Sequence, residues 1–212
     1  MTAILADDLV KAILNHVPFD GWSDAALMAG AAEVGLDEAE MRALLPAGVA
    51  GAIQHYLAMA DADMLAAYQA LDPQPQRMHE KIRALILLRL EQAVPHKETV
   101  RMTVNWLAKP AQAGAASRQL YRTVDTMWRT AGDEATDFSF YSKRATLAAV
   151  YSSTLLAFLG DDTPDLSKTI AFLDNRLGDV ARIPKMTAPI RKISENMMRF
   201  GKGMSAGPFA RR

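Results

Sequence analysis

The sequence predicts an all-α protein of nine to ten helices. Apolar residues recur mainly at the three- and four-residue spacing of a helix, and helix-favouring Ala, Leu and Met supply much of the 50% hydrophobic content. No run of alternating apolar and polar residues bounded by turn signals predicts a strand. Proline and glycine interrupt the periodic pattern and leave segments of about 10 to 24 residues between the breaks. The predicted breaks are Pro18 to Gly21, Gly35, Pro46, Asp72 to Pro75, Pro95, Pro110, Gly132, Gly160 to Pro164 and Pro184.

The first predicted elements are three short helices that end before Pro46. The first helix covers Ile4 to His16. Ser23 can cap the second helix, which ends at the turn residue Gly35. Asp37 can cap the third helix. This arrangement has the spacing of a helix-turn-helix unit, and we place its boundary at residues 1–46.

This unit resembles the N-terminal three-helix unit of the tetracycline-repressor family, whose pattern is matched by Gly21, Gly35 and Pro46. A helix that reads the DNA major groove needs hydrogen-bond donors and cations that hold phosphates. Here the corresponding helix carries three acids between Asp37 and Glu40 and one cation, Arg42. We therefore expect no binding to nucleic acid, and a ligand-responsive transcriptional regulator is the alternative function.

The following helices are expected to form one unit, residues 47–184, which the repressor resemblance implies is a ligand-binding and dimerisation domain. Asp72 to Pro75 is the best candidate for a joint, but it is too short to separate independent domains. The most apolar segment is the charge-free run Ala145 to Leu159. A membrane-spanning helix needs ~20 apolar residues, so this shorter run predicts a helix buried on all sides in a soluble core.

The last predicted unit, residues 185–212, is a basic amphipathic helix and tail. It carries seven basic residues and one acid, so it is near +6 and the preceding 184 residues are near −6, although the whole chain is formally neutral. An apolar stripe beside a cationic face suits an anionic bilayer surface, and docking on a protein surface is the alternative. The residues expected to meet the membrane are Ile190, Arg191, Lys192, Ile193, Met197, Phe200 and Lys202.

Motifs that indicate catalysis or a metal are absent from the sequence. There is no cysteine, and the four histidines form neither HExxH nor the Glu-x-x-His of di-iron bundles. Asp61 with Asp63, and Asp161 with Asp162, are carboxylate pairs that we expect to be solvated, the second pair also capping the turn before Pro164. The sequence therefore predicts no enzyme activity, no metal and no cofactor.

The N-terminus predicts the cellular location. Asp7 and Asp8 lie within its apolar pattern, and it has no basic leader, so we expect neither a secretory signal nor a transit peptide. The absence of cysteine fits a reducing compartment. We therefore expect a bacterial cytoplasmic protein that is peripheral to the inner membrane.

The third quarter of the chain carries a second, denser resemblance. Residues 120–180 resemble the C-terminal signature of the Coq-nine family, lipid-binding accessory proteins of ubiquinone biosynthesis. The family's aspartate-led aromatic cluster reads TDFSFYSKRA here, with Ser139 and Phe140 where the family typically has Asn and Trp. Pro95 to Lys97 follow the family's PHK, and HVPFDGWSDAAL is the clearest match in the N-terminal part.

The resemblance implies a non-catalytic, homodimeric accessory protein that binds an isoprenoid quinone precursor and presents it at the membrane to the demethoxyubiquinone hydroxylase. It also implies that Asp137, Phe140, Tyr141 and Arg144 belong to a surface patch that binds this hydroxylase. From the residues alone, the aromatic pair could equally pack inward at a helix start.

The bound molecule is expected to be an isoprenoid or a phospholipid held between the helices, because the family binds lipids and because methionine side chains adapt to flexible hydrocarbon. Apolar residues at helical spacing are more often plain core, so the resemblance decides the interpretation. The candidate lipid-binding residues are Met64, Leu88, Met102, Leu107, Trp128, Leu147, Tyr151, Leu155, Phe158 and Phe172.

Overall fold

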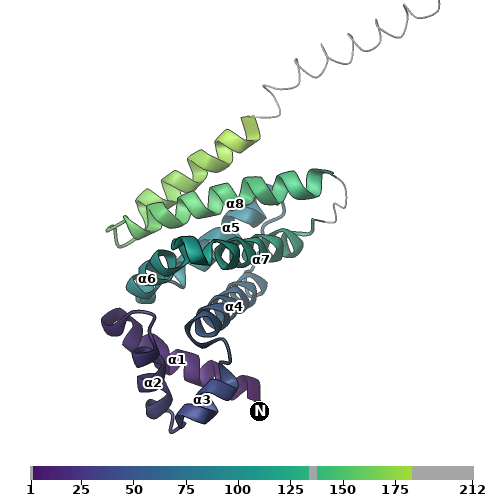
Figure 1. Ribbon diagram of the computed structural model, residues 1–212. Helices are drawn as coiled ribbons and strands as arrows, with labels where there is room; N and C mark the ends of the chain where they lie inside the picture. Colours follow the sequence, from purple (N-terminus) through teal and green to yellow (C-terminus); the bar gives the residue numbers. More distant parts are fainter. Residues whose placement is uncertain (1, 134–137, 183–212) are drawn as a thin grey trace, which may run out of the picture.

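A computed structural model describes residues 2–133 and 138–182, and these residues form helices and connecting turns without strands (Figure 1). The α-helices are α1 Thr2–Asp20, α2 Asp24–Glu33, α3 Glu38–Leu44, α4 Gly48–Gln69, α5 Met78–Glu91, α6 Lys97–Leu107, α7 Ala113–Ala131 and α8 Phe138–Leu159. Residues 167–182 form a ninth helix. Short 3₁₀ helices, η1 Val94–His96 and η2 Pro110–Gln112, precede α6 and α7. The all-α prediction is confirmed.

Side-chain caps define the N-terminal helices as the sequence predicts. The Ser23 hydroxyl accepts a hydrogen bond from a first-turn N–H of α2 at 3.2 Å. Asp37 and Glu40 form a reciprocal capping box at the start of α3. The predicted break at Pro18 to Gly21 falls at its C-terminal end, because α1 continues through Pro18 to Asp20 and stops before Gly21, whose φ is +65°. Pro18 has no N–H to donate to the carbonyl oxygen of Leu14, and the helix ends two residues later.

The first hydrophobic core lies between α1, α2, α3 and the first half of α4. The closest approach is at Gly30 of α2, where a Cβ would lie 2.6 Å from the backbone nitrogen of Ile13 in α1. Only glycine lets the two helices approach this closely. The buried members of this core are Leu9, Val10, Ile13, Val17, Trp22, Leu27, Ala31, Met41, Leu45, Ala52, Ile53 and Tyr56. Packing thus joins the start of α4 to the N-terminal unit, and the domain boundaries stay predictions.

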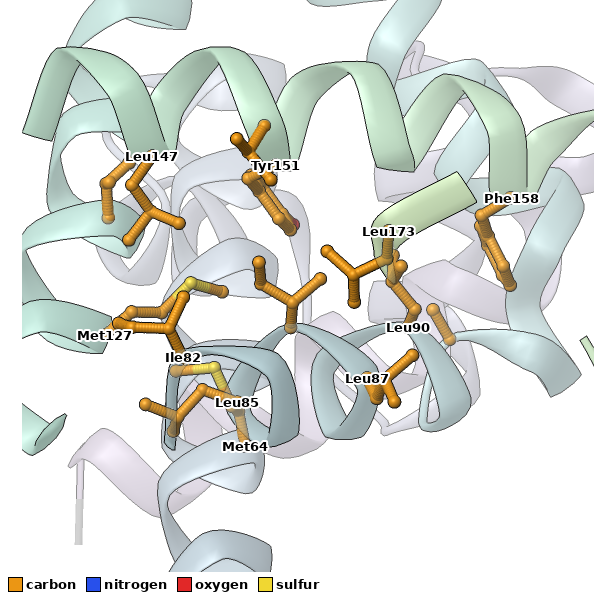
Figure 2. Close-up of a cluster of buried hydrophobic side chains, with 14 of the residues drawn as sticks. Met64, Ile82, Leu85, Leu87, Leu90, Met127, Leu147, Tyr151, Phe158 and Leu173 are labelled. Carbon is orange, nitrogen blue, oxygen red and sulfur yellow. The ribbon is translucent and has the colours of Figure 1, made fainter. Parts of the chain in front are cut away.

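The second core lies between α4, α5, α7, α8 and the helix of residues 167–182. Figure 2 shows Leu147 and Tyr151 on α8 directed toward α5, and Met127 of α7 belongs to the same cluster as Leu85. Met64 reaches this core from the second half of α4. The long helix α4 therefore contributes to both cores and connects the N-terminal unit with the upper layer of helices (Figure 1).

Helix α8 is not buried on all sides, which corrects the prediction for Ala145 to Leu159. Leu147 and Phe158 are buried, but Ala145 and Ala149 are exposed, and Leu156 is 60% exposed. Figure 1 shows α8 with α5 and α7 on one side and the helix of residues 167–182 on another, and the side of α8 that carries Ala145, Ala149 and Leu156 stays exposed. Among the described residues, no single helix has the length and composition to cross a membrane; α3 and α4 qualify only as a pair, and they bend by 54° at their junction.

Candidate functional site

An apolar cavity of about 280 Å³ lies between five helices, α4 to α8. This volume is near the lower end of small-molecule sites, which span roughly 300–1,000 Å³. The side chains at its deep end are buried, whereas those at its rim on α6, α7 and α8 are partly exposed. The lining residues are Tyr56, Leu57, Arg89, Leu90, Ala93, Val100, Thr103, Val104, Leu107, Ala108, Ala116, Gln119, Leu120, Thr123, Tyr151, Ser152 and Leu155.

Helical spacing explains how α6 and α7 line the cavity. On α6, Val100, Val104 and Leu107 recur at four- and three-residue intervals, so they share the face that the cavity meets. On α7, Ala116 and Leu120 recur in the same way. The small side chain at position 116 leaves space at the rim, where a larger residue would fill the opening.

A buried ion pair closes the deep end of the cavity. Arg89 on α5 is 5% exposed, and its Nε donates to Oδ1 of Asp61 on α4 at 3.2 Å. The hydroxyl of Thr123 on α7 donates to the same carboxylate at 2.9 Å. Burial raises the pKa of Asp61 above its ordinary value, while the charge of Arg89 opposes this shift. Asp61 is therefore not the solvated carboxylate that we expected, whereas Asp63 is exposed.

Two tyrosines stand beside this ion pair. Tyr56 and Tyr151 line the cavity from α4 and α8, and both are buried. Burial raises the pKa of each phenol above 10, so both hydroxyls are protonated near neutral pH and can donate hydrogen bonds. The deep end of the cavity thus combines an arginine, a carboxylate and two phenols within otherwise apolar walls.

The N-terminal unit contacts the wall of the cavity through Trp22. The Trp22 indole Nε1 donates to the hydroxyl of Thr103 on α6 at 2.9 Å, and this hydroxyl donates to the carbonyl oxygen of Thr99 at 2.8 Å. The ring of Trp22 also lies 6.0 Å from that of Tyr56. Two cavity-lining side chains are therefore held by a residue that precedes α2.

Three of the ten predicted lipid-binding residues line this cavity: Leu107, Tyr151 and Leu155. Trp128 and Leu147 instead line a second hollow of about 400 Å³ between α5, α7, α8 and residues 167–182. The structure therefore divides the predicted set between two separate spaces.

The other five predicted residues line neither space. Met64 and Phe158 are fully buried within the second core, and Leu88 packs against that core. Met102 packs against the first core, and Phe172 lies 5.4 Å from the guanidinium of Arg176. Sequence reasoning missed Tyr56, Arg89 and Thr123, although one signal was available: a single arginine within the apolar stretch of α5.

Arg144 is part of the protein interior, which corrects its prediction as a surface contact. It is 4% exposed and joins the start of α8 to the end of α7. Its Nε donates to Asp125 at 2.7 Å, and its Nη1 donates to Asp133 at 3.2 Å. Lys143 donates to the same Asp133 at 2.6 Å, and its carbonyl oxygen accepts from the Trp128 indole. The basic pair of the signature thus fixes the corner between two helices.

The aromatic pair of the signature lies at the start of α8. Phe140 packs under the Arg144 guanidinium, whose central carbon is 3.4 Å from the ring centre. Tyr141 is 68% exposed, and its ring meets Phe140 edge-on at 5.1 Å between centres. Tyr141 therefore presents an aromatic surface that Phe140 and Arg144 support from behind. Asp137 lies outside the described residues.

A second polar cluster fixes the C-terminus of α8. Lys97, of the predicted PHK match, donates to the carbonyl oxygen of Asp161, and Arg101 donates to that of Leu159 at 2.9 Å. Basic groups are favourable here because the last carbonyls of a helix carry partial negative charge.

The Asp161 carboxylate caps the helix that follows α8. It is 2% exposed and accepts hydrogen bonds from the backbone N–H and hydroxyl groups of Thr163 and Thr169. Burial would raise the pKa of Asp161, but these hydrogen bonds hold it well below its usual range. Its bonds to Thr163 form the predicted cap of the turn before Pro164, but Asp161 is not solvated.

The described residues contain no candidate metal site and none of the residues predicted to meet the membrane. In residues 2–133 and 138–182, no group of three or more metal-binding side chains comes together. All residues predicted to meet the membrane, from Ile190 to Lys202, lie outside the described part of the chain.

Comparison with known sequences places the C-terminal helices in a family context. Residues 113–184 match the sequence model of the COQ9 family, from the start of α7 through the last described helix. The mitochondrial ubiquinone biosynthesis proteins COQ9 of Rattus norvegicus and Homo sapiens are each 28% identical to this chain over 197 residues. These matches cover 90% of this chain and 63% and 62% of the relatives, so the chain spans about three fifths of their length.

The structural comparison gives the fold. The chain superposes on the crystal structure of a TetR transcriptional regulator from Nitrosomonas europaea with a TM-score of 0.68, covering 84% of this chain and 98% of that one. The two sequences are 18% identical, so the likeness concerns architecture alone. Both resemblances that the sequence suggested are confirmed. The chain is therefore similar to the COQ9 proteins of ubiquinone biosynthesis in sequence and to TetR regulators in fold.

Proposed function

We propose that this chain serves ubiquinone biosynthesis as a non-catalytic accessory protein. It binds an isoprenoid quinone precursor in the cavity that the five helices α4 to α8 line. The observation that carries the proposal is the cavity itself, which is apolar and has a small polar end. It occurs in a chain whose sequence is similar to the COQ9 proteins. Such a space suits a molecule with a long apolar part and a few polar atoms. The helices α7 and α8, which form one side of it, lie within the region that matches the family.

In this proposal the protein presents its ligand to the demethoxyubiquinone hydroxylase through the start of α8. Tyr141 is the strongest candidate anchor, because an exposed tyrosine can bury a large area in a partner at low entropic cost. Phe140 and Arg144 act behind it as support. Delivery at a membrane surface rests on the basic, apolar-striped sequence of residues 185–212.

The exposed side of α8 supports the homodimer. Ala145, Ala149 and Leu156 recur at helical spacing on that side, and they give it a small-residue, apolar surface that a second helix can cover. A twofold contact of this kind would pair the same residues of two copies.

The experiment that tests lipid binding is extraction of the purified protein with organic solvent, followed by mass spectrometry. The protein should release an isoprenoid quinone intermediate in near-stoichiometric amount. Ala116→Trp, which fills the rim of the cavity, should lower the yield at least tenfold. Ala62→Trp, an equally large change at an exposed position of α4, should not. A lipid-free protein, or equal yields from both variants, would remove the cavity from the proposed function.

The TetR-like fold favours a second candidate, a ligand-responsive regulator of transcription. Against it, the only cation on α3, Arg42, is held by Glu38 at 2.6 Å, and Glu40 is engaged in the helix cap. A mobility-shift assay at low salt, where phosphate attraction is strongest, distinguishes the two. Sequence-specific retention at nanomolar protein would favour the regulator.

A further inference from the structure

The guanidinium of Arg89, at the deep end of the cavity, has N–H donors that make no hydrogen bond with the described residues. An arginine carries five N–H donors, and among the described residues Arg89 uses its Nε on Asp61 and makes no other hydrogen bond. No enclosed side-chain nitrogen or oxygen among the described residues lacks a partner. Because the terminal nitrogens of Arg89 have no such partner, they are not enclosed, and they therefore face accessible space.

That open space has two sides. Arg89, Tyr56 and Ala93 line the apolar cavity, and the same three residues line a second, more polar hollow that also contains Lys11, Asp63 and His96. Arg89 thus stands in the wall between an apolar chamber and a polar one. An amphipathic ligand meets both environments at this position.

The two phenols add donors of the same kind. The hydroxyls of Tyr56 and Tyr151 make no hydrogen bond with any described residue, although both side chains are buried. Tyr56, Tyr151 and Arg89 all line the cavity, and they lie near enough to one another for their charged forms to interact. Because no enclosed polar atom lacks a partner, these hydroxyls open onto accessible space, and a ligand that supplies acceptor oxygens here would gain new hydrogen bonds.

We propose that Arg89, Tyr56 and Tyr151 form a head-group subsite that binds the carbonyl oxygen of an uncharged, quinone-like ring, with the apolar tail of the ligand directed toward the rim at Ala116. The neutral head follows from charge: Asp61 already balances Arg89, so the subsite offers donors without a net positive charge. The direction of the tail follows from the walls, where the aliphatic side chains of Val104, Leu107, Leu120 and Leu155 outnumber the polar side chains of Gln119 and Ser152. This inference rests on the proposed function and assigns the orientation of its ligand.

The test compares two probes that share one tail. Decylbenzoquinone carries acceptor oxygens, and decylbenzene does not; each is titrated by equilibrium dialysis against the full chain. The wild type should bind the quinone about tenfold more tightly than decylbenzene. Tyr151→Phe should remove about fivefold of that preference, as expected for loss of one neutral hydrogen bond, and leave decylbenzene binding unchanged. Tyr68→Phe, a buried tyrosine that does not line the cavity, is the matched control.

Arg89→Met should also lower the preference for the quinone. Because this change leaves Asp61 without its partner and can lower folding stability, the double variant Tyr56→Phe with Tyr151→Phe serves as the second measurement. Its preference for the quinone should be smaller than that of Tyr151→Phe alone, and a wild-type preference in this variant would contradict the subsite.

The outcomes separate the two proposals. If decylbenzene binds and the quinone binds no more tightly, the head-group subsite is wrong while the apolar cavity still holds a ligand. If neither probe binds the wild type, both are wrong. Tighter binding of decanoate than of decylbenzoquinone would contradict the neutral head.

Discussion

Replacing Arg144 with alanine should lower the free energy of unfolding by about 3–5 kcal/mol, the usual cost of removing one partner from a buried ion pair. The side chain is 4% exposed, and it lies between two carboxylates, Asp125 at 2.7 Å and Asp133 at 3.2 Å. Its Nη1 also donates to the carbonyl oxygen of Phe140 at 3.3 Å. The substitution would leave these acceptors with fewer donors and remove the support beneath the aromatic pair.

A matched control exists on the same carboxylate. Arg129 donates to Asp125 at 2.7 Å, but its side chain is 71% exposed, so Arg129→Ala should cost no more than ~1 kcal/mol. Both variants are compared with the wild type by urea denaturation followed by circular dichroism. Equal costs for the two arginines would refute the reasoning, because it depends on burial and not on the presence of an ion pair.

The difference in free energy of unfolding between the wild type and Arg144→Ala should also depend on pH. A hydrogen bond from Lys143 lowers the pKa of Asp133, burial opposes this, and Arg144 adds to the lowering. A carboxylate with a lowered folded-state pKa contributes stability above its unfolded value of ~3.9, and that contribution is lost as pH falls through the folded value. The gap between wild type and Arg144→Ala should therefore be full above about pH 5 and narrow below pH 4.

Three further outcomes are expected. Gly30→Ala should lower the free energy of unfolding by at least 1–3 kcal/mol, because the added Cβ meets the backbone of Ile13. Gly178→Ala, in open space within a helix, should raise it by up to about 1 kcal/mol. Urea denaturation measures both values, and equal effects would contradict the close approach of α1 and α2 at Gly30. Asp161→Asn should lower the melting temperature at pH 7. This loss should shrink as pH falls below 4, because the unfolded-state carboxylate then takes up a proton while the folded one, whose pKa is lowered, stays ionised; a pH-independent loss would argue against the charged cap. Tyr141→Ala should change the free energy of unfolding by less than about 0.5 kcal/mol, yet it should abolish capture of the hydroxylase from the same cells. An unfolded variant would show that the Tyr141 ring stabilises the fold and is not a partner contact.

The local features of this fold were open to prediction from sequence. The caps at Ser23 and Asp37 depend on residues three positions apart, so the pattern contains both partners. The helical nature of Ala145 to Leu159 followed in the same way from composition. Its full burial did not, because an apolar sequence cannot say which neighbouring helix will be missing from one side.

The polar end of the cavity was not predictable for a related reason. Arg89 and Asp61 are 28 positions apart, and Thr123 is 62 positions from Asp61, so no local pattern connects them. Helical spacing marks Met64 and Leu107 equally as inward-facing, yet only Leu107 meets open space. The difference between a filled core and a cavity depends on how five helices pack, which periodicity does not encode.

The central claim, that the cavity between α4 and α8 holds the apolar ligand, is tested most directly by photo-crosslinking. A benzoquinone whose decyl tail ends in a diazirine is bound, irradiated and mapped by peptide mass spectrometry. Our account predicts labelled peptides within α6, α7 and α8, concentrated near Leu107, Ala116 and Leu155 at the rim, and loss of this label in Ala116→Trp. Labelling confined to α1, α2 and α3, or a pattern that Ala116→Trp leaves unchanged, would contradict it.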